Sequence, residues 1–214
     1  MNNDYKKIPG NAVYSKDGIL LEMFLQDIPK VSKIIEVGTF YGRHAVLWSS
    51  IVQSKGIECD YITIDEENYL GSWDARIVAE KNIRLHCKQV ERKFIHSFDS
   101  APNKIKEICK DESADIIAID MEYNLIKLSR MLSNWHKCLS VGGYLKWYIP
   151  SPQTINDADY KNTIQELQEL GYKIEYSNDI GYAKKTKSAS IQDAKQKNKT
   201  STDVITEQTI QEKK

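Results

Sequence analysis

The chain has 214 residues with 30 basic and 30 acidic side chains, so its formal net charge is zero. This length suits one domain with a sizeable core, and the balanced charge excludes a general attraction to nucleic acid or to anionic membranes. The N-terminal residues lack the apolar segment of a signal peptide, and no apolar run approaches the roughly 18 residues of a membrane span. Four scattered cysteines are typical of free thiols in a reducing compartment, so we expect a cytoplasmic protein with no membrane partner.

The composition changes at Lys185. From there to Lys214 the chain contains no aromatic residue, glycine or proline, and seven lysines face four acids. A segment this polar buries too little apolar surface to offset the entropy that it loses on ordering. We therefore expect one domain over residues 1–184, followed by a disordered, basic polar tail over residues 185–214.

Short β-branched runs alternate with segments of helical period along residues 1–184. This alternation predicts an α/β fold, with a mostly parallel seven-stranded sheet, helices on both faces and a C-terminal antiparallel hairpin. In chain order, the expected elements are a helix from Ser15, a strand over 33–37, a helix after Gly42, a strand over 61–64, a helix over 74–87, a strand over 93–98, a helix over 103–109, a strand over 115–119, a helix over 125–138, a strand over 144–149, a helix over 158–170 and hairpin strands over 172–176 and 180–184.

Acidic residues lie at the ends of the first four expected strands. They are Glu36, Asp65, Asp99 and Asp120. In an open α/β sheet, ligands bind at this carboxyl edge, where the strand order reverses. A single acid there is most often a helix cap or a turn former, but four at one edge repel one another and need a polar or cationic ligand. Their chemistry favours hydroxyl, amine and sulfonium groups over phosphate.

The first strand is followed by a turn that contains two glycines, Gly38 and Gly42. Without side chains, these residues let the backbone turn tightly and approach a ligand. The helix that follows offers free N–H groups and a partial positive charge at its N-terminus. Phe40 stands between the glycines, and we expect its side chain to point into the core.

Five segments occur in a characteristic order along the chain. They are residues 36–42, Asp65, Asp99, the run "DIIAIDMEY" and the run "LSVGG". In this order they resemble the motifs of class I S-adenosylmethionine-dependent methyltransferases, from about residue 17 to residue 184. Within that class they look most like the small-molecule O-methyltransferase branches. The resemblance implies a Rossmann-like sheet whose last, antiparallel strand lies between the fifth and the sixth.

The resemblance also implies S-adenosyl-L-methionine as the cofactor. The turn at Gly38 would approach its methionyl part, and Glu36 would lie near its amino end or orient the turn. Asp65 would accept hydrogen bonds from both ribose hydroxyls, and Asp99 or the adjacent backbone would meet the adenine amine. The implied cofactor-binding residues are Glu36, Gly38, Thr39, Gly42, Asp65, Asp99 and Asp120.

A dinucleotide cofactor fits the sequence less well. Its fingerprint is GxGxxG, whereas Phe40 occupies the middle glycine position here and the spacing is GxxxG. Asp65 would suit a ribose in either case, so that residue does not discriminate between the two cofactors.

Methyl transfer from a sulfonium needs an aligned acceptor, exclusion of water and, for a hydroxyl acceptor, removal of a proton. After the fourth strand, Asp120 and Glu122 are the predicted catalytic residues, as base or orienting groups. Tyr123 stands where related enzymes carry a histidine, and no oxygen ligands follow the fifth strand, so we expect no metal site. His44 is interpreted as a packing or capping residue.

The predicted function is O-methylation of a small hydroxylated or saccharide acceptor. One alternative is a cofactor-binding or non-catalytic protein of the same fold that interacts through its tail. A nucleic-acid methyltransferase is less favoured, because Met121 and Glu122 replace the prolines of a "DPPY"-type loop and the body has no basic stripe. The domain has no insertion long enough for a lid, which favours a homodimer or another chain completing the acceptor site.

Overall fold

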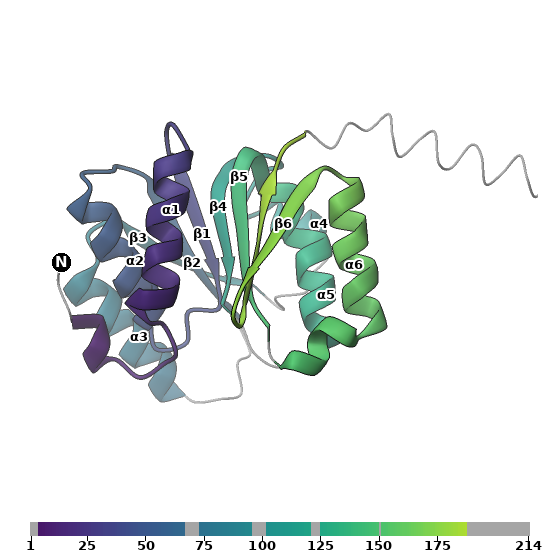
Figure 1. Ribbon diagram of the computed structural model, residues 1–214. Coiled ribbons are helices and arrows are strands. Elements are labelled where there is room, and N and C mark those ends of the chain that lie inside the picture. Colours follow the sequence, from purple (N-terminus) through teal and green to yellow (C-terminus); the bar gives the residue numbers. More distant parts are fainter. Residues whose placement is uncertain (1–3, 67–72, 96–101, 121–124, 150, 188–214) are drawn as a thin grey trace, which may run out of the picture.

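The computed structural model describes residues 4–66, 73–95, 102–120, 125–149 and 151–187. Seven strands form one sheet in the order β3-β2-β1-β4-β5-β7-β6 (Figure 1). The strands are β1 (Lys33–Val37), β2 (Asp60–Glu66), β3 (Val90–Ile95), β4 (Ala114–Ile119), β5 (Leu139–Tyr148), β6 (Tyr172–Ser177) and β7 (Ile180–Lys185).

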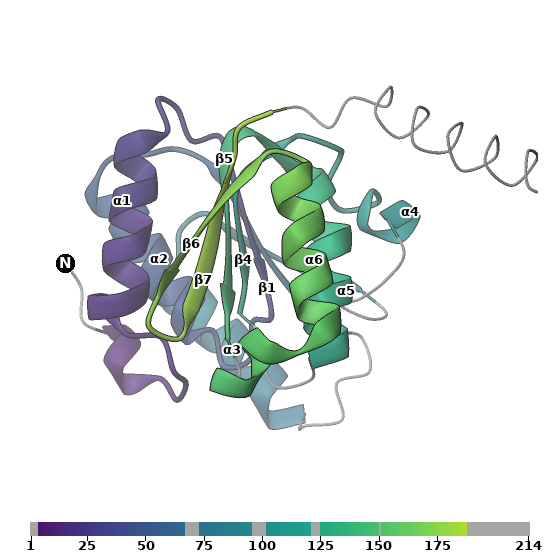
Figure 2. The same ribbon diagram turned by 45° about the vertical axis from the view of Figure 1, so that its right-hand side comes forward.

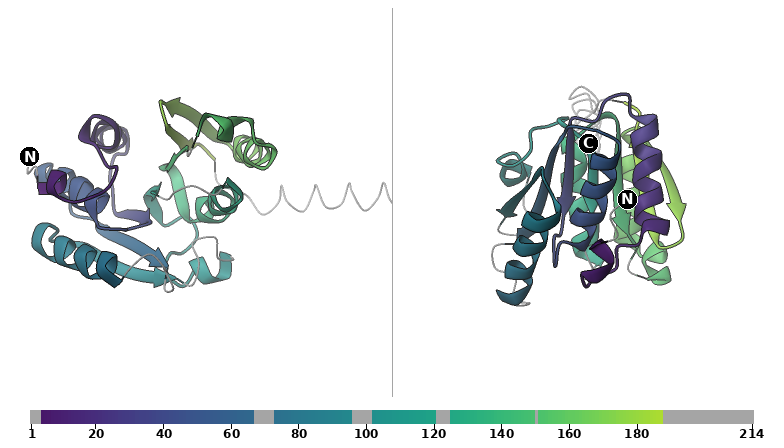
Figure 3. Two further views of the ribbon diagram at one scale, coloured as in Figure 1. Left: turned by 90° about the horizontal axis from the view of Figure 1, so that it is seen from below. Right: turned by 90° about the vertical axis from the view of Figure 1, so that its left-hand side faces the viewer.

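Helices cover both faces of this sheet, as Figures 1 and 3 show. α1, α2 and α3 lie over one face, and α4, α5 and α6 lie over the other (Figure 2). The α-helices are α1 (Ile19–Asp27), α2 (Arg43–Ser54), α3 (Trp73–His86), α4 (Pro102–Ile105), α5 (Leu125–Trp135) and α6 (Ala158–Glu169). Shorter helical turns are Asp4–Lys7, Tyr14–Gly18, His136–Cys138 and Pro152–Asn156. Among the described helices, none is long and apolar enough to cross a membrane.

The central strands are parallel and buried on both faces, which explains their almost unbroken apolar runs. β1 pairs in parallel with β2 and β4, and this register sets Glu36 between Thr63 and Ala118. β7 pairs antiparallel with β5 and with β6. The structure thus confirms the predicted fold class, including the antiparallel hairpin at the end of the domain.

Successive residues of β1 supply two separate cores, because side chains alternate across a strand. Ile34 packs with Phe24 and Trp48 under α1 and α2. Ile35 packs with Trp135 under α5, on the opposite face. Burial of each such side chain contributes roughly 1.5–3 kcal/mol, so the sheet is held firmly from both sides and its carboxyl edge is a rigid platform.

The first helix differs from its predicted start. Ser15 makes no capping hydrogen bond, and a π-helical turn over Tyr14–Gly18 precedes α1. The Asp17 side chain instead ties the start of this turn to the preceding residue, because its Oδ2 accepts a hydrogen bond from the Val13 amide at 3.0 Å. The wide π turn carries the Asp17 side chain inward, where it is fully buried.

Two strands begin at least three residues earlier than predicted. β3 begins at Val90 rather than at Lys93, and β5 begins at Leu139 rather than at Tyr144. The predicted end of the third strand, at residue 98, lies outside the described residues. The two glycines expected to open the fifth strand lie inside it: Gly142 has a φ of 86°, and the pairing with β4 shifts register at this place. They form an irregularity of the kind that glycine permits within a strand, not the turn that precedes one.

Lys185, the first residue of the predicted tail, belongs to β7 and is buried. Its Nζ lies 3.0 Å from Glu112 Oε1 and donates to the Leu139 carbonyl at 2.7 Å. The ordered domain therefore extends past residue 184. Residues 188–214 lie outside the described residues, so the disordered tail stays a prediction.

Candidate functional site

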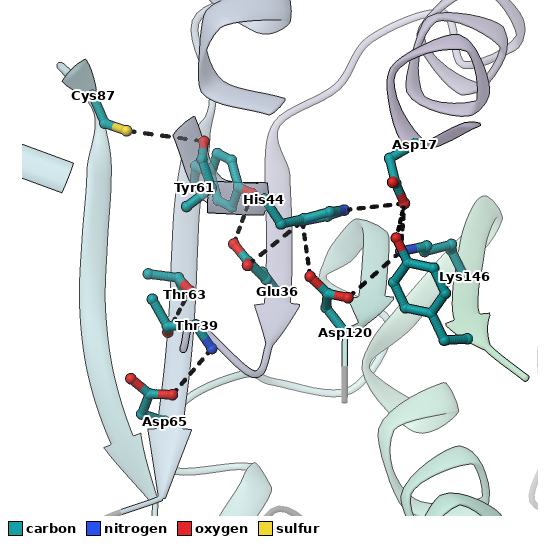
Figure 4. Close-up of polar contacts among 12 residues, drawn as sticks. Asp17, Glu36, Thr39, His44, Tyr61, Thr63, Asp65, Cys87, Asp120 and Lys146 are labelled. Carbon is teal, nitrogen blue, oxygen red and sulfur yellow. Dashed lines mark hydrogen bonds and ion pairs between the residues drawn. The ribbon is translucent and has the colours of Figure 1, made fainter. Parts of the chain in front are cut away.

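Three of the predicted carboxylates meet at the carboxyl edge of the central strands (Figure 4). Glu36 lies near the end of β1, Asp65 near the end of β2, and Asp120 directly after β4. Glu36 is completely buried, Asp65 is 9% exposed, and the Asp120 side chain is 20% exposed. Asp99 and Glu122, the other predicted acids, lie outside the described residues.

The glycine turn after β1 is tied closely to the sheet. The Gly38 amide donates to the Ile64 carbonyl at 2.8 Å, and the Gly42 amide donates to the Thr39 carbonyl at 2.7 Å. Gly38 and Gly42 have φ values of 103° and 81°, a left-handed region that favours glycine. The backbone geometry at both positions therefore favours glycine, as the sequence predicts.

Phe40 does not point into the core, so that prediction was wrong. It has a φ of 47° and is 45% exposed, and its ring rests against Tyr41 with 4.1 Å between the ring centroids. A left-handed residue between two left-handed glycines turns its side chain outward, away from the sheet. This conformation is uncommon for a bulky residue. The aromatic ring consequently lies on the surface of the turn that carries Thr39.

Asp65 holds the turn through both of its carboxylate oxygens. Oδ1 accepts a hydrogen bond from the Thr39 amide at 3.0 Å, and Oδ2 accepts one from Arg92 Nη2 at 2.5 Å. Arg92 also donates to the Arg76 carbonyl at 2.7 Å. A carboxylate has about four lone-pair sites, so two remain for a ligand hydroxyl.

A buried ion pair that the sequence did not predict lies beside Asp120. Lys146 on β5 and Asp17 are both fully buried, with Nζ 2.9 Å from Asp17 Oδ1 and 4.0 Å from Asp120 Oδ1. The Tyr148 hydroxyl donates to Asp17 Oδ1 at 2.6 Å. Burial opposes ionisation of Asp17, but the Lys146 charge and the Tyr148 hydrogen bond hold its pKa well below the usual value. The pair therefore joins the π-helical turn to the centre of the sheet.

His44, in the first turn of α2, bridges the acids of this network (Figure 4). Its Nδ1 lies 3.5 Å from Glu36 Oε1 and 3.9 Å from Asp120 Oδ2, and its Nε2 lies 3.8 Å from Asp17 Oδ1. The ring also packs on Trp48, with 4.3 Å between centroids. Burial, with a contribution from Lys146, lowers the pKa of His44 to about 3. The imidazole is therefore neutral at pH 7 and keeps one nitrogen lone pair.

The two acids that face His44 bind protons more tightly than usual. Burial and the nearby Asp120 raise the pKa of Glu36 well above its ordinary value, against the hydrogen bond that Tyr61 donates to Glu36 Oε2 at 2.9 Å. Burial raises the pKa of Asp120 to about 6, against the pull of Lys146. Burial is the largest cause of both shifts, and a neighbouring acid adds to each pKa: Asp120 to that of Glu36, and Asp17 to that of Asp120.

Several buried polar atoms of this network have no hydrogen-bond partner among the described residues. They are Glu36 Oε1, both ring nitrogens of His44 and Lys146 Nζ, which makes only ion-pair contacts. Buried polar atoms in folded proteins are nearly always paired, so four such atoms at one place are exceptional. Glu36 Oε1 and His44 Nδ1 face each other and Asp120, and this arrangement is complementary to a cation or a group of N–H donors.

No protein-family model matches the chain, and no curated protein matches it. Solved structures do match. The SAH-bound methyltransferase PaMTH1 from Podospora anserina is 10% identical with a TM-score of 0.57, and the match covers 83% of this chain and 80% of that one. An rRNA methylase from Streptococcus thermophilus is 10% identical with a TM-score of 0.52, and the match covers 79% of this chain and 95% of that one.

An O-methyltransferase family protein from Burkholderia thailandensis is 9% identical with a TM-score of 0.53. The match covers 80% of this chain and 57% of that protein, so the chain spans little more than half of its length. The shared feature is the seven-stranded sheet with its antiparallel hairpin. The chain thus has the class I methyltransferase fold, as the order of its sequence motifs predicts.

Proposed function

We propose that this chain is an S-adenosylmethionine-dependent methyltransferase that methylates an oxygen of a small hydroxylated or saccharide acceptor. The observation that carries the proposal is the set of orphan acceptors at the end of β1, in a sheet of methyltransferase topology. Glu36 Oε1, His44 Nδ1 and Asp120 Oδ2 point toward one another. The amino-acid end of the cofactor carries an ammonium group, whose three N–H donors match three such acceptors.

The glycine turn supports the same assignment. Gly38 and Gly42 leave the backbone of the turn free of side chains where the methionyl part of the cofactor would lie. Thr39 couples this turn to Asp65, because its amide donates to Asp65 and its Oγ1 lies 2.6 Å from Thr63 Oγ1. Asp65 would receive the ribose hydroxyls on its two remaining lone-pair sites. Asp99 is proposed near the adenine, as the resemblance implies.

When bound, the cofactor supplies a methyl group already activated by the sulfonium charge. Asp120 would then act as the base or the orienting group for the acceptor hydroxyl, since its side chain is the most exposed of the three rim carboxylates. Lys146, 4.0 Å from Asp120 Oδ1, would hold that carboxylate in place. Glu122 is proposed as a second orienting group, and no metal ion is proposed to take part in turnover.

A small acceptor is favoured over nucleic acid by charge. Residues 188–214 carry five lysines and four acids, a net of +1, so residues 1–187, which include the buried Lys185, carry −1 of the total of zero. A body of this charge does not attract a polyanion. A homodimer is proposed to complete the acceptor site, because the domain is short. The alternative is a non-catalytic protein of the same fold that binds the cofactor or nothing and interacts with a partner through its tail.

Transfer of labelled methyl groups tests the proposal. The full chain is incubated with methyl-labelled S-adenosylmethionine, excess EDTA and a panel of small phenols, alcohols and sugars, with total RNA as a separate acceptor. We expect label in a small acceptor, loss of most turnover in Asp120→Asn, and normal turnover in Asp111→Asn, a control at an exposed acid paired with Lys106. Label in RNA alone would contradict the small-acceptor proposal, and activity that requires added magnesium would contradict a metal-free reaction.

A further inference from the structure

We propose that Glu36, His44 and Asp120 form a binding site for one divalent transition-metal ion, and that this ion competes with the methyl donor. Each residue offers one inward-facing ligand atom: Glu36 Oε1, His44 Nδ1 and Asp120 Oδ2 (Figure 4). The three residues come from β1, from α2 and from the end of β4, so the fold itself brings them together. From the sequence we expect no metal site, and Asp120 is predicted only as a cofactor-binding and catalytic residue.

The geometry is close to that of a three-ligand metal site. His44 Nδ1 lies 3.5 Å from Glu36 Oε1 and 3.9 Å from Asp120 Oδ2, and all three ligand atoms lie within 4.8 Å of one another. Metal bonds to carboxylate oxygen and imidazole nitrogen are about 2.0–2.2 Å long, so an ion between the three atoms would draw each of them in by a small side-chain movement. Open coordination positions would remain for water.

In each of the three side chains, the second oxygen or nitrogen, which points away from the ion site, lies near another polar residue, as is usual for metal ligands in proteins. Tyr61 donates to Glu36 Oε2 at 2.9 Å and leaves Oε1 free. Lys146 lies 4.0 Å from Asp120 Oδ1 and leaves Oδ2 facing the histidine. On the far side of the ring, Asp17 Oδ1 lies 3.8 Å from His44 Nε2, the position of the carboxylate in a carboxylate–histidine–metal arrangement. The outer groups therefore favour the orientation that coordination needs.

The charge of the network calls for a cation. Lys146 is the buried cation nearest to these acids among the described residues, and Asp17 at 2.9 Å already balances it. Lys146 also lies 4.0 Å from Asp120 Oδ1, but one ammonium group shared by Asp17 and Asp120 leaves the three acids Asp17, Glu36 and Asp120 short of positive charge. A divalent ion would balance the negative charges of Glu36 and Asp120 and displace the protons that they otherwise hold.

The ligand types select the metal class. Two carboxylate oxygens with one imidazole nitrogen suit Mn²⁺, Fe²⁺ or Zn²⁺, because carboxylates favour manganese and imidazole favours iron and zinc. Mg²⁺ prefers an octahedral shell of oxygens and keeps most of its waters, so it is a poorer match. Mn²⁺ and Zn²⁺ are therefore the probes of choice, with Mg²⁺ as the comparison.

The competition rests on the proposed function, whereas the ion site does not. The donor's ammonium group would use the same three acceptors, so the ion and the donor exclude each other. The metal-free protein would then be the form that binds the donor, in agreement with the turnover that the proposed function predicts in excess EDTA. The ion would act as an inhibitor of methyl transfer rather than as a part of the reaction.

The ion site is tested on the full chain without any donor. The protein is stripped with EDTA, dialysed and titrated with Mn²⁺ by calorimetry and by the loss of the free Mn²⁺ electron-resonance signal. We expect one ion per chain, and a weakening by more than about tenfold in His44→Phe and in Glu36→Gln. The matched control is His86→Phe, because His86 Nδ1 lies 3.4 Å from a single acid, Asp4, and should leave the affinity unchanged.

Circular dichroism and thermal melting establish whether each variant is folded. If His44→Phe does not fold, Glu36→Gln still tests the site. Equal Mn²⁺ affinity in the wild type, His44→Phe and Glu36→Gln, or no Mn²⁺ binding at all, would overturn the site. Donor titrations with and without saturating Mn²⁺ follow. A donor affinity that Mn²⁺ leaves unchanged would overturn the competition, and absence of donor binding in EDTA would overturn the proposed function while the ion titration still judges the site.

Discussion

Arg92 on β3 and Asp65 on β2 form a hydrogen-bonded ion pair, with Arg92 Nη2 2.5 Å from Asp65 Oδ2. Both side chains are almost buried, with 11% and 12% exposure. The second oxygen of Asp65 receives the Thr39 amide, so the pair joins β3, β2 and the glycine turn. The residue proposed to bind ribose is therefore held in place before any ligand arrives. Preorganisation of this kind lowers the entropy cost of binding.

Asp65→Ala should weaken S-adenosylmethionine binding by on the order of 2 kcal/mol, because the ribose hydroxyls lose a charged acceptor and the turn loses its anchor. Calorimetric titration of the folded variant measures the effect. Asp60→Ala, at the other end of the same strand, is the matched control and should bind normally. An unchanged donor affinity in Asp65→Ala would remove Asp65 from the site.

Removing one charge of the buried Asp17–Lys146 pair should lower the free energy of unfolding far more than removing both charges together. Lys146→Met leaves the Asp17 carboxylate buried without its partner, and we expect the free energy of unfolding to fall by roughly 3–5 kcal/mol. Asp17→Asn combined with Lys146→Met removes both charges and keeps an acceptor for the Val13 amide, so it should cost less than Lys146→Met alone. Urea unfolding of the wild type, Asp17→Asn, Lys146→Met and the double variant measures the four free energies of this cycle. Strictly additive losses would show that the two residues do not interact.

His136 should make the protein sensitive to acid. Burial, together with Lys137 and Lys185, lowers its pKa from 6.5 to about 4. Between these values the unfolded chain binds a proton that the folded chain does not, so the histidine's contribution to stability is complete above pH 6.5 and is lost as the pH falls toward 4. The loss is up to about 1.4 kcal/mol per pH unit. His136→Phe should flatten this slope in urea unfolding at several pH values, and an identical slope would exclude His136 as its cause.

The sequence predicts that the domain ends at residue 184, whereas the structure describes an ordered chain up to residue 187. Truncation after Lys187 should leave the melting temperature and the donor affinity nearly unchanged, because residues 188–214 offer no apolar packing face. Truncation after Lys184 should lower the melting temperature, since it removes the buried Lys185 and its contacts with Glu112 and Leu139. Scanning calorimetry compares the two with the full chain. A large drop in melting temperature after truncation at Lys187 would show that residues 188–214 dock on the domain.

The fold was predictable because its signals are local. Three of the five residues of the strand at Lys33–Val37 are β-branched, and the spacing of Gly38 and Gly42 indicates a backbone turn that glycine makes most easily. The errors arose where tertiary contacts decide the local structure. Gly142 lies inside β5 because pairing with β4 continues across it, and periodicity along one strand contains no information about its neighbour.

The candidate site was predictable only in part, for the same reason. Glu36, Asp65 and Asp120 share one edge because parallel strands end together, which the strand pattern implies. Asp17 meets Lys146 across more than half of the chain, and no spacing rule connects them. One signal was present: a lysine in the middle of the apolar run "GYLKWYI" needs a partner if the strand is buried.

Calorimetric titration of the EDTA-treated full chain with S-adenosylmethionine, S-adenosylhomocysteine and NAD tests the central claim most directly. The account predicts that the first two bind at one site per chain and that NAD does not bind at the same concentrations. The expected contacts are the orphan acceptors at Glu36 and His44 for the ammonium group and Asp65 for the ribose. Selective binding of NAD, or no binding of either methionine derivative, would contradict the account.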